Sequence, residues 1–123
     1  DGLDGLLAVK NFDTKLAEGV MLLTPFAADA TDDLTKKFVK EYKDKYDEVP
    51  NQFAADAYDA IYAIKAAMEE AKVTPDMGDA LKSAMTKVTI DGLTGDEMSW
   101  SESGEVNKDP KAVVIENGEY VGM

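Results

Sequence analysis

The sequence predicts an α/β fold in which one strand, three helices and a closing meander of short strands follow one another along 123 residues. Apolar residues recur with helical spacing through the middle of the chain, which is typical of helices that bury one face. Short apolar runs stand on either side and have the length of buried strands. Near the end, Asn117-Gly118 lies between the runs VVIE and EYV, and this dipeptide predicts a two-residue hairpin turn.

The first expected strand lies in the run EGVMLLT, which extends from Glu18 to Thr24 just before a proline. A helix should begin after Thr31, whose hydroxyl is the expected cap for the free amides of the first turn. The apolar residues of this helix fall on one face, and lysines fill much of the other: Leu34, Phe38, Val39, Tyr42 and Tyr46 form the apolar face. The pattern predicts an amphipathic helix that covers a flat apolar surface.

Two more helices are expected before the tail. Asn51 is the expected cap of the second, and apolar residues surround nearly all of it from Phe53 to Met68, so we expect it to be buried. The third should open at Thr74 with Pro75 at its first position. One face of this third helix is formed by Met77, Leu81, Met85 and Val88.

Gly92 and Gly95 should end helical structure, after which strand-like runs alternate with turns. These runs are EMSW, a turn at Ser103 and Gly104, and the terminal hairpin. Three helices between a single parallel-type strand and a hairpin leave too few strands to bury both faces of a sheet. The chain is therefore expected to be part of a larger fold.

The composition excludes several functions. A net charge of -12 disfavours binding to nucleic acids and to anionic membrane surfaces. The sequence contains no Cys and no His, which excludes disulfides, thiolate or histidine metal sites and Ser-His-Asp or Cys-His catalysis from this segment. The acidic clusters lack the ligand spacing of an EF-hand. We expect no cofactor, no metal site and no enzymatic activity.

No apolar run approaches the roughly 18 residues that cross a bilayer. The opening DGLDGLLAVKN also lacks the basic start and the small-residue cleavage site of a signal peptide. We expect a soluble chain, with any targeting segment outside it.

Three segments together resemble a known family. The run FVKEYKDKYDEVPNQFAADAYDAIYAIKAAMEEA joins a lysine-rich helix, a proline break and a YDA element at residues 58–60. The tail DGLTGDEMSWSESGEVNKDPKAVVIENGEYV holds a Gly-x-x-Gly turn, a strand, an acidic glycine turn and the Asn-Gly hairpin, and the chain opens on the acidic turn DGLDGLLA. In this order the segments resemble the C-terminal portion of branched-chain amino acid (Leu/Ile/Val-binding-protein-like) extracytoplasmic solute-binding proteins of ABC transporters.

The resemblance implies the type I fold of periplasmic binding proteins, in which two α/β lobes are joined by three crossing strands and close on a ligand. The chain would be a C-terminal fragment of that fold. Residues 1–24 would belong to the second lobe, and residues 25–92 would form the helical part of the first lobe between two hinge crossings. Residues 93–123 would return to the second lobe with the terminal hairpin.

The resemblance also implies ligand-binding residues. An acidic residue at the position of Asp1 receives the α-ammonium of a bound amino acid in this family, a charge-assisted bond that a dry cleft strengthens. Phe53 matches a position where an aromatic ring borders the ligand. Leu3, which stands where many relatives have tryptophan, and Phe26 are weaker candidates, with core packing as the alternative. Asp59 of the YDA element is expected to make structural hydrogen bonds, and the groups that hold the ligand carboxylate are expected upstream.

We therefore expect a subunit that captures a branched-chain or related amino acid for an ABC permease by closure of two lobes. It should work outside the cytoplasm, in the periplasm or anchored by lipid at the cell surface. Alone, this segment should bind ligand poorly, and exposed apolar helix faces make a segment-exchanged homodimer plausible. Two alternatives are a ligand-sensing domain of a receptor or regulator with the same fold, and an acidic helical interaction module. A hydrolase would require a catalytic group that the absent His and Cys do not provide.

Overall fold

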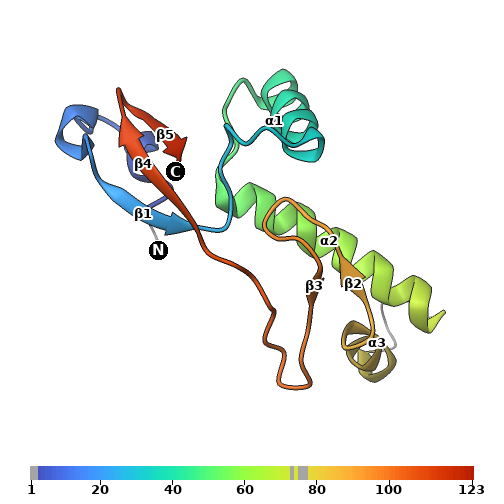
Figure 1. Cartoon of the computed structure of the whole chain (residues 1–123). Coiled ribbons are helices and arrows are strands. Elements are labelled where there is room, and N and C mark those ends of the chain that lie inside the picture. The colour runs from blue at the N-terminus through green and yellow to red at the C-terminus, as the bar shows by residue number, and fades with distance from the viewer. Residues whose placement is uncertain (1–2, 73, 75–77) are drawn as a thin grey trace. The chain divides into compact units, whose positions relative to one another are not determined.

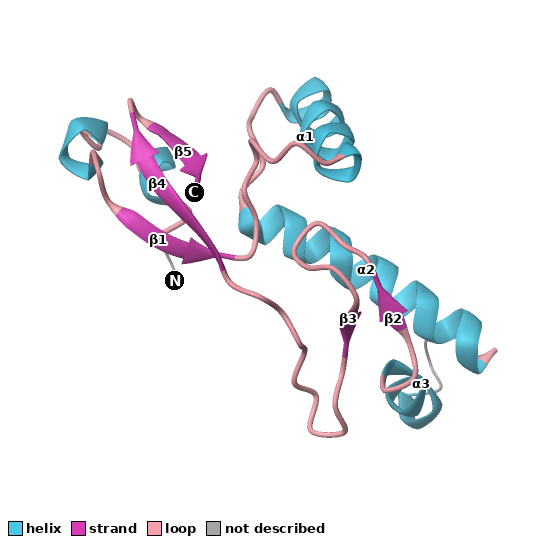
Figure 2. Cartoon of the chain, viewed as in Figure 1, coloured by secondary structure: helices cyan, strands magenta, loops and turns pink. Residues whose placement is uncertain are grey.

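A computed structural model describes residues 3–72, 74 and 78–123. The described residues form helices and strands in the predicted α/β order (Figures 1 and 2). The elements are η1 (Leu6–Ala8), η2 (Thr14–Ala17), β1 (Met21–Thr24), α1 (Asp33–Tyr46), α2 (Gln52–Ala71), α3 (Gly78–Met85), β2 (Thr89–Ile90), β3 (Met98–Ser99), β4 (Lys111–Glu116) and β5 (Glu119–Gly122). They divide into two compact units: the first runs to Ala55 and resumes at Pro110, and the second is Asp56–Asp109.

The first unit holds a three-stranded sheet in the order β1-β4-β5. Both pairs are antiparallel, with Met21 opposite Val114 and Val114 opposite Val121. The expected strand after Glu18 is confirmed, but its expected parallel-type character is wrong within this sheet. The reason is that the tail of the chain returns beside it: the Ile115 amide donates to the Val20 carbonyl at 2.9 Å.

The core of the first unit lies on one face of this sheet. Its buried members are Ala17, Leu22, Ala27, Val113 and Ile115, with Leu6, Leu7, Phe12, Val20 and Tyr120 packed against them. Alternation along β1 buries Leu22 and leaves Met21 and Leu23 exposed. A strand with apolar residues on both faces suits a sheet that is covered on both sides.

The terminal hairpin is confirmed at the predicted turn. Asn117 and Gly118 have φ values of 53° and 79°, and such a pair of positive values matches the twist of the two strands it joins. The carboxylate of Glu18, just before β1, accepts the Asn117 amide through both oxygens at 3.1 and 2.9 Å. This contact fixes the tip of the hairpin to a residue 99 positions earlier in the chain.

Helix α1 begins one residue later than predicted, because its cap is Asp32 and not Thr31. The Asp32 backbone is extended, and its carboxylate accepts the Thr35 amide at 2.8 Å. Burial raises the pKa of Asp32, but hydrogen bonds from Thr35 lower it by more, so that the pKa lies below its usual value of 3.8. The predicted apolar face is present as a row of aromatic rings. The ring centroids of Phe38 and Tyr42 lie 5.9 Å apart.

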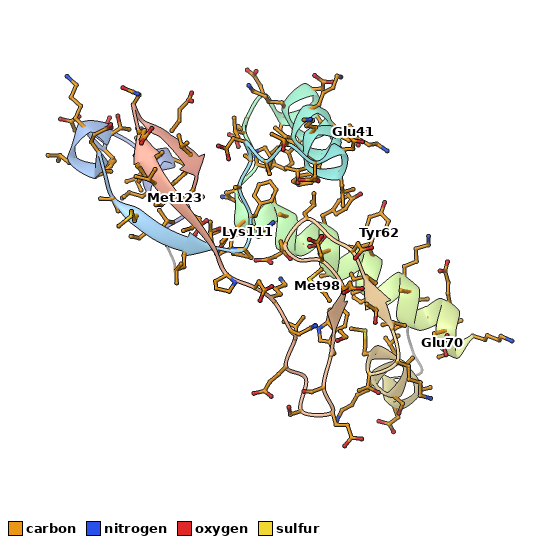
Figure 3. The ribbon with its side chains drawn as sticks, viewed as in Figure 1. Glu41, Tyr62, Glu70, Met98, Lys111 and Met123 are labelled. Carbon is orange, nitrogen blue, oxygen red and sulfur yellow. The ribbon has the colours of Figure 1, made fainter. Side chains whose placement is uncertain are left out.

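Helix α2 opens as predicted, with the Asn51 side chain accepting the Ala54 amide at 3.2 Å. Its expected burial on nearly all sides is wrong for the described chain. A narrow stripe of small residues and one acid is buried at every fourth position: Ala55, Asp59, Ala63 and Ala67. Ile61 remains 66% exposed, and Ile64 and Tyr62, the latter labelled on α2 in Figure 3, are exposed as well.

The rest of the second unit comprises α3 and a small antiparallel sheet that pairs Thr89 with Ser99. The expected start of the third helix at Pro75, and the contribution of Met77 to its face, lie outside the described residues. The helix ends at Met85, so the expected inclusion of Val88 is wrong. Val88 immediately precedes β2, where β-branched residues favour the extended chain. None of the described helices is long and apolar enough to span a membrane.

Candidate functional site

The acidic turn at the start of the chain is held by a tyrosine from the last strand. The Tyr120 hydroxyl donates to the Leu3 carbonyl at 2.8 Å and accepts the Leu7 amide at 3.4 Å. Leu3 is 41% exposed, whereas the ring of Tyr120 packs against the core of the first unit. Tyr120 therefore fixes the backbone of the turn and leaves the Leu3 side chain at the surface. Asp1, the expected partner of a ligand ammonium, lies outside the described residues.

A second acid of this turn is buried. Asp4 is 8% exposed, and among the described residues its Oδ2 atom has no hydrogen-bond partner. Burial raises the pKa of the Tyr120 hydroxyl, and the nearby charge of Asp4 raises it further, while hydrogen bonds from Leu7 and Leu6 act in the opposite direction. A buried carboxylate oxygen without a donor is unfavourable by itself. Oδ2 of Asp4 can therefore accept a hydrogen bond from a donor such as an N–H group.

The two aromatic candidates have different surroundings. Phe53, on the first turn of α2, is 55% exposed, so its ring is available for contact with another molecule. Phe26 is only 4% exposed, and its ring meets that of Phe38 edge-on at 6.0 Å. The geometry of Phe26 is that of core packing, the alternative given above for this residue. A ligand-binding role for Leu3, Phe26 and Phe53 remains a prediction.

A buried polar contact joins the segments that carry Phe26 and Phe53. The Thr24 hydroxyl, at the end of β1, lies 3.1 Å from Oε1 of Gln52, the first residue of α2. The same hydroxyl oxygen accepts the Phe26 amide at 3.3 Å. Thr24 and Gln52 are both buried, so water does not compete for this contact. The start of α2 is thereby fixed to the end of the sheet within the first unit.

Asp59 makes the structural hydrogen bonds that the sequence predicts. Its Oδ1 accepts the Leu93 amide at 2.8 Å, and its Oδ2 accepts the Thr94 amide at 2.8 Å and the Thr94 hydroxyl at 2.7 Å. These donors lie in the Gly-x-x-Gly turn between β2 and β3. Gly92 is required for this approach, because a Cβ atom there would lie 2.6 Å from the Asp59 carboxyl carbon and 2.6 Å from Cε of Met98, labelled in Figure 3. We name this arrangement the Asp59 brace.

Other features of the described chain give no additional site. A surface hollow near the hairpin tip is lined by Thr14, Lys15, Glu18, Asn117 and Gly118, and it contains none of the residues predicted to bind ligand. Within residues 3–72, 74 and 78–123 there is no group of three or more acidic side chains placed to hold a metal ion.

Sequence reasoning missed three residues that position the candidate site. Tyr120 reads as an ordinary strand residue, and nothing local indicates that it contacts Leu3, 117 positions away. Gln52 reads as a helix-start residue, and its contact with Thr24 depends on how the chain folds back. Asp4 was visible in the acidic turn, but its burial has no signal in the sequence. An alignment of related sequences that showed paired changes would reveal such contacts.

Comparison with known proteins is consistent with this architecture. The family model described as periplasmic binding protein matches residues 7–119. A leucine-binding protein from Thermotoga maritima is 25% identical, with a TM-score of 0.71, over 87% of this chain and 30% of that protein. A putative branched-chain amino acid ABC transporter protein from Rhodospirillum rubrum is 27% identical, with a TM-score of 0.67, over 92% of this chain and 35% of the other.

A solute-binding protein from R. palustris, solved in complex with benzoate, shares the fold at 17% identity, with a TM-score of 0.78, over all of this chain and 32% of that protein. No curated protein matches. The chain thus spans about a third of the length of its solved relatives. The predicted family and type I fold are confirmed, since the family model matches most of the sequence. The chain belongs to the periplasmic binding protein family.

Proposed function

We propose that the protein containing this chain is the solute-binding subunit of an ABC importer, and that it captures a branched-chain or related amino acid by closing two lobes. The observation that carries the ligand class is the 25% identity to a leucine-binding protein over 87% of the chain. The lobe boundaries near Pro25 and Gly92 are part of this proposal. So is a location outside the cytoplasm, where the subunit would deliver its ligand to a membrane permease.

The acidic turn supports recognition of an ammonium group. Asp4 supplies a buried carboxylate oxygen without a partner among the described residues, and Asp1 precedes it by three positions in the sequence. A carboxylate that meets an ammonium in a closed cleft forms a charge-assisted hydrogen bond, which is stronger there than in water. This chain contains no arginine, so an arginine that held the carboxylate of the ligand would have to come from elsewhere in the protein.

Phe53 supports recognition of an apolar side chain. Its exposed ring on the first turn of α2 offers a flat apolar surface. An apolar ligand group placed against such a ring is removed from water, which stabilises the complex. Both proposed contacts, of a carboxylate with an ammonium group and of a ring with an apolar group, are binding contacts.

Thermal unfolding of the whole protein with a panel of amino acids and benzoate tests the proposal. A ligand at a hundred times its Kd stabilises the native state by about 2.7 kcal/mol, which raises the unfolding midpoint. We expect a shift with leucine, isoleucine or valine. A shift with benzoate alone would transfer the ligand class to aromatic acids, and no shift across the panel would refute the ligand assignment.

A pair of variants on one helix tests the site. Phe53→Ala should weaken leucine binding about tenfold, corresponding to about 1.4 kcal/mol of lost contact. Ile61→Ala is the matched control, because Ile61 is also apolar and exposed on α2. Equal affinities for both variants and the wild type, measured by calorimetry, would remove Phe53 from the site.

A further inference from the structure

We propose that Asn117-Gly118 is a site of spontaneous deamidation, and that Glu18 limits its rate by holding the turn closed. The inference rests on the hairpin tip and is independent of the proposed ligand. It concerns a covalent modification that the chain undergoes without an enzyme, a cofactor or an oxidant.

The reaction is an intramolecular acyl transfer. The backbone nitrogen of Gly118 attacks the side-chain amide carbon of Asn117 and loses its proton, and the bond from that carbon to the side-chain nitrogen breaks. The nitrogen leaves as ammonia, and a five-membered succinimide remains. Water then adds to one of the two ring carbonyls, which yields aspartate or isoaspartate at position 117. Glycine favours the attack because no Cβ atom shields its nitrogen.

The folded turn exposes the Asn117 side chain to water but restrains the Asn117 backbone. Asn117 is exposed, so water reaches its side chain. Its φ of 53° belongs to the closed left-handed turn, and ring closure requires rotation of its backbone away from this conformation. Both oxygens of Glu18 hold the Asn117 amide at 3.1 and 2.9 Å. The reaction should therefore proceed through an opened turn whose population depends on Glu18.

Asn11 provides a matched control within the chain. It is also exposed and also has a positive φ, of 64°. The residue that follows it is Phe12, whose side chain shields the attacking nitrogen and packs against the core of the first unit. The two asparagines thus share exposure and backbone region and differ in the residue that must attack.

Deamidation should weaken the terminal hairpin. The product places a second carboxylate beside Glu18, and like charges in contact repel. Isoaspartate also adds one atom to the backbone path, which a two-residue turn cannot accommodate without a change of register. The affected strand β4 contributes Val113 and Ile115, which are among the most deeply buried residues of the core.

Peptide mapping by mass spectrometry tests the proposal on the whole protein, incubated at mildly alkaline pH. The peptide with Asn117 should gain about 1 Da of mass several times faster than the peptide with Asn11. In Glu18→Ala, the loss of the hydrogen bonds should raise the Asn117 rate about fivefold and leave the Asn11 rate unchanged. Glu18→Gln, which keeps one acceptor oxygen, should give an intermediate rate.

Equal deamidation rates at Asn117 and Asn11 in the wild type would overturn the proposal that Asn117-Gly118 is the modification site. An unchanged Asn117 rate in Glu18→Ala would overturn the role of Glu18. A rise at both asparagines in that variant would show general unfolding and would also count against a local effect of Glu18. Ligand binding by the same samples reports separately on the proposed function.

Discussion

Removal of the Asp59 carboxylate should strongly destabilise the second unit. In Asp59→Ala, the amides of Leu93 and Thr94 lose their acceptors, and the hydroxyl of Thr94 keeps only the weak acceptor Sδ of Met98 at 3.7 Å. Asp59 and Thr94 are buried, so water does not replace the missing oxygen atoms. Each buried donor left unsatisfied costs about 1–3 kcal/mol, and for three donors that bind the same carboxylate group we expect a total of about 3–5 kcal/mol.

Amide hydrogen exchange at Leu93 and Thr94 measures this effect locally. A loss of about 3 kcal/mol in the free energy of local opening corresponds to amide exchange that is roughly a hundredfold faster. Asp59→Asn keeps one oxygen and should cost less, while Asp79→Asn, at an exposed acid in the first turn of α3, should change stability by less than about 0.5 kcal/mol. Exchange at Thr94 in Asp59→Ala that equals the Asp79→Asn rate would refute the assignment of the Asp59 brace.

Three further predictions concern other contacts. Gly92→Ala should destabilise the folded state by about 1–3 kcal/mol, because the new Cβ would lie 2.6 Å from the Asp59 carboxyl carbon. Gly5→Ala, with open space around its Cβ, should not destabilise it, and urea unfolding compares the two variants. Asp32→Ala should cost about 1 kcal/mol at neutral pH. Because the folded pKa of Asp32 is lowered, its contribution is present above pH 3.8 and is lost as the pH falls through the folded value, so acid titration should bring the variant and the wild type together. The folded pKa of Tyr120 is raised, so its hydroxyl contributes fully to stability below pH 10.0, and this contribution is lost as the pH rises through the folded pKa. Tyr120→Phe should not lose stability in this alkaline range, which unfolding followed by circular dichroism can measure.

Local patterns in the sequence predicted those elements whose causes are local. The hairpin at Asn117-Gly118 requires only two residues that tolerate positive φ, and it is present. The cap at Asn51 requires only a side-chain oxygen near the free amides of α2, and it is also present. The predicted cap of α1 was wrong by one position, because Thr31, Asp32 and Asp33 are neighbours that can all cap a helix and their residue types do not choose among them.

Contacts between distant segments had no such local signal. Tyr120 meets Leu3 across 117 positions, and Glu18 meets Asn117 across 99. Their partners are set by the return of β4 beside β1, which a pattern of alternating apolar residues does not specify. For the same reason the sequence indicated which residue types surround the candidate site but missed the contacts of Thr24 with Gln52 that hold it in place.

Helix α2 shows how a correct pattern can lead to a wrong expectation. Apolar residues on nearly all sides predicted burial on nearly all sides, yet the described chain covers only the stripe at Ala55, Asp59, Ala63 and Ala67. The opposite side, with Ile61 and Ile64, remains exposed, and so do Met21 and Leu23 on β1. Isolated exposed apolar residues are common, but a second apolar stripe along a helix indicates a contact surface. These exposed apolar residues of α2 and β1 are therefore the candidate contact surfaces of the described chain.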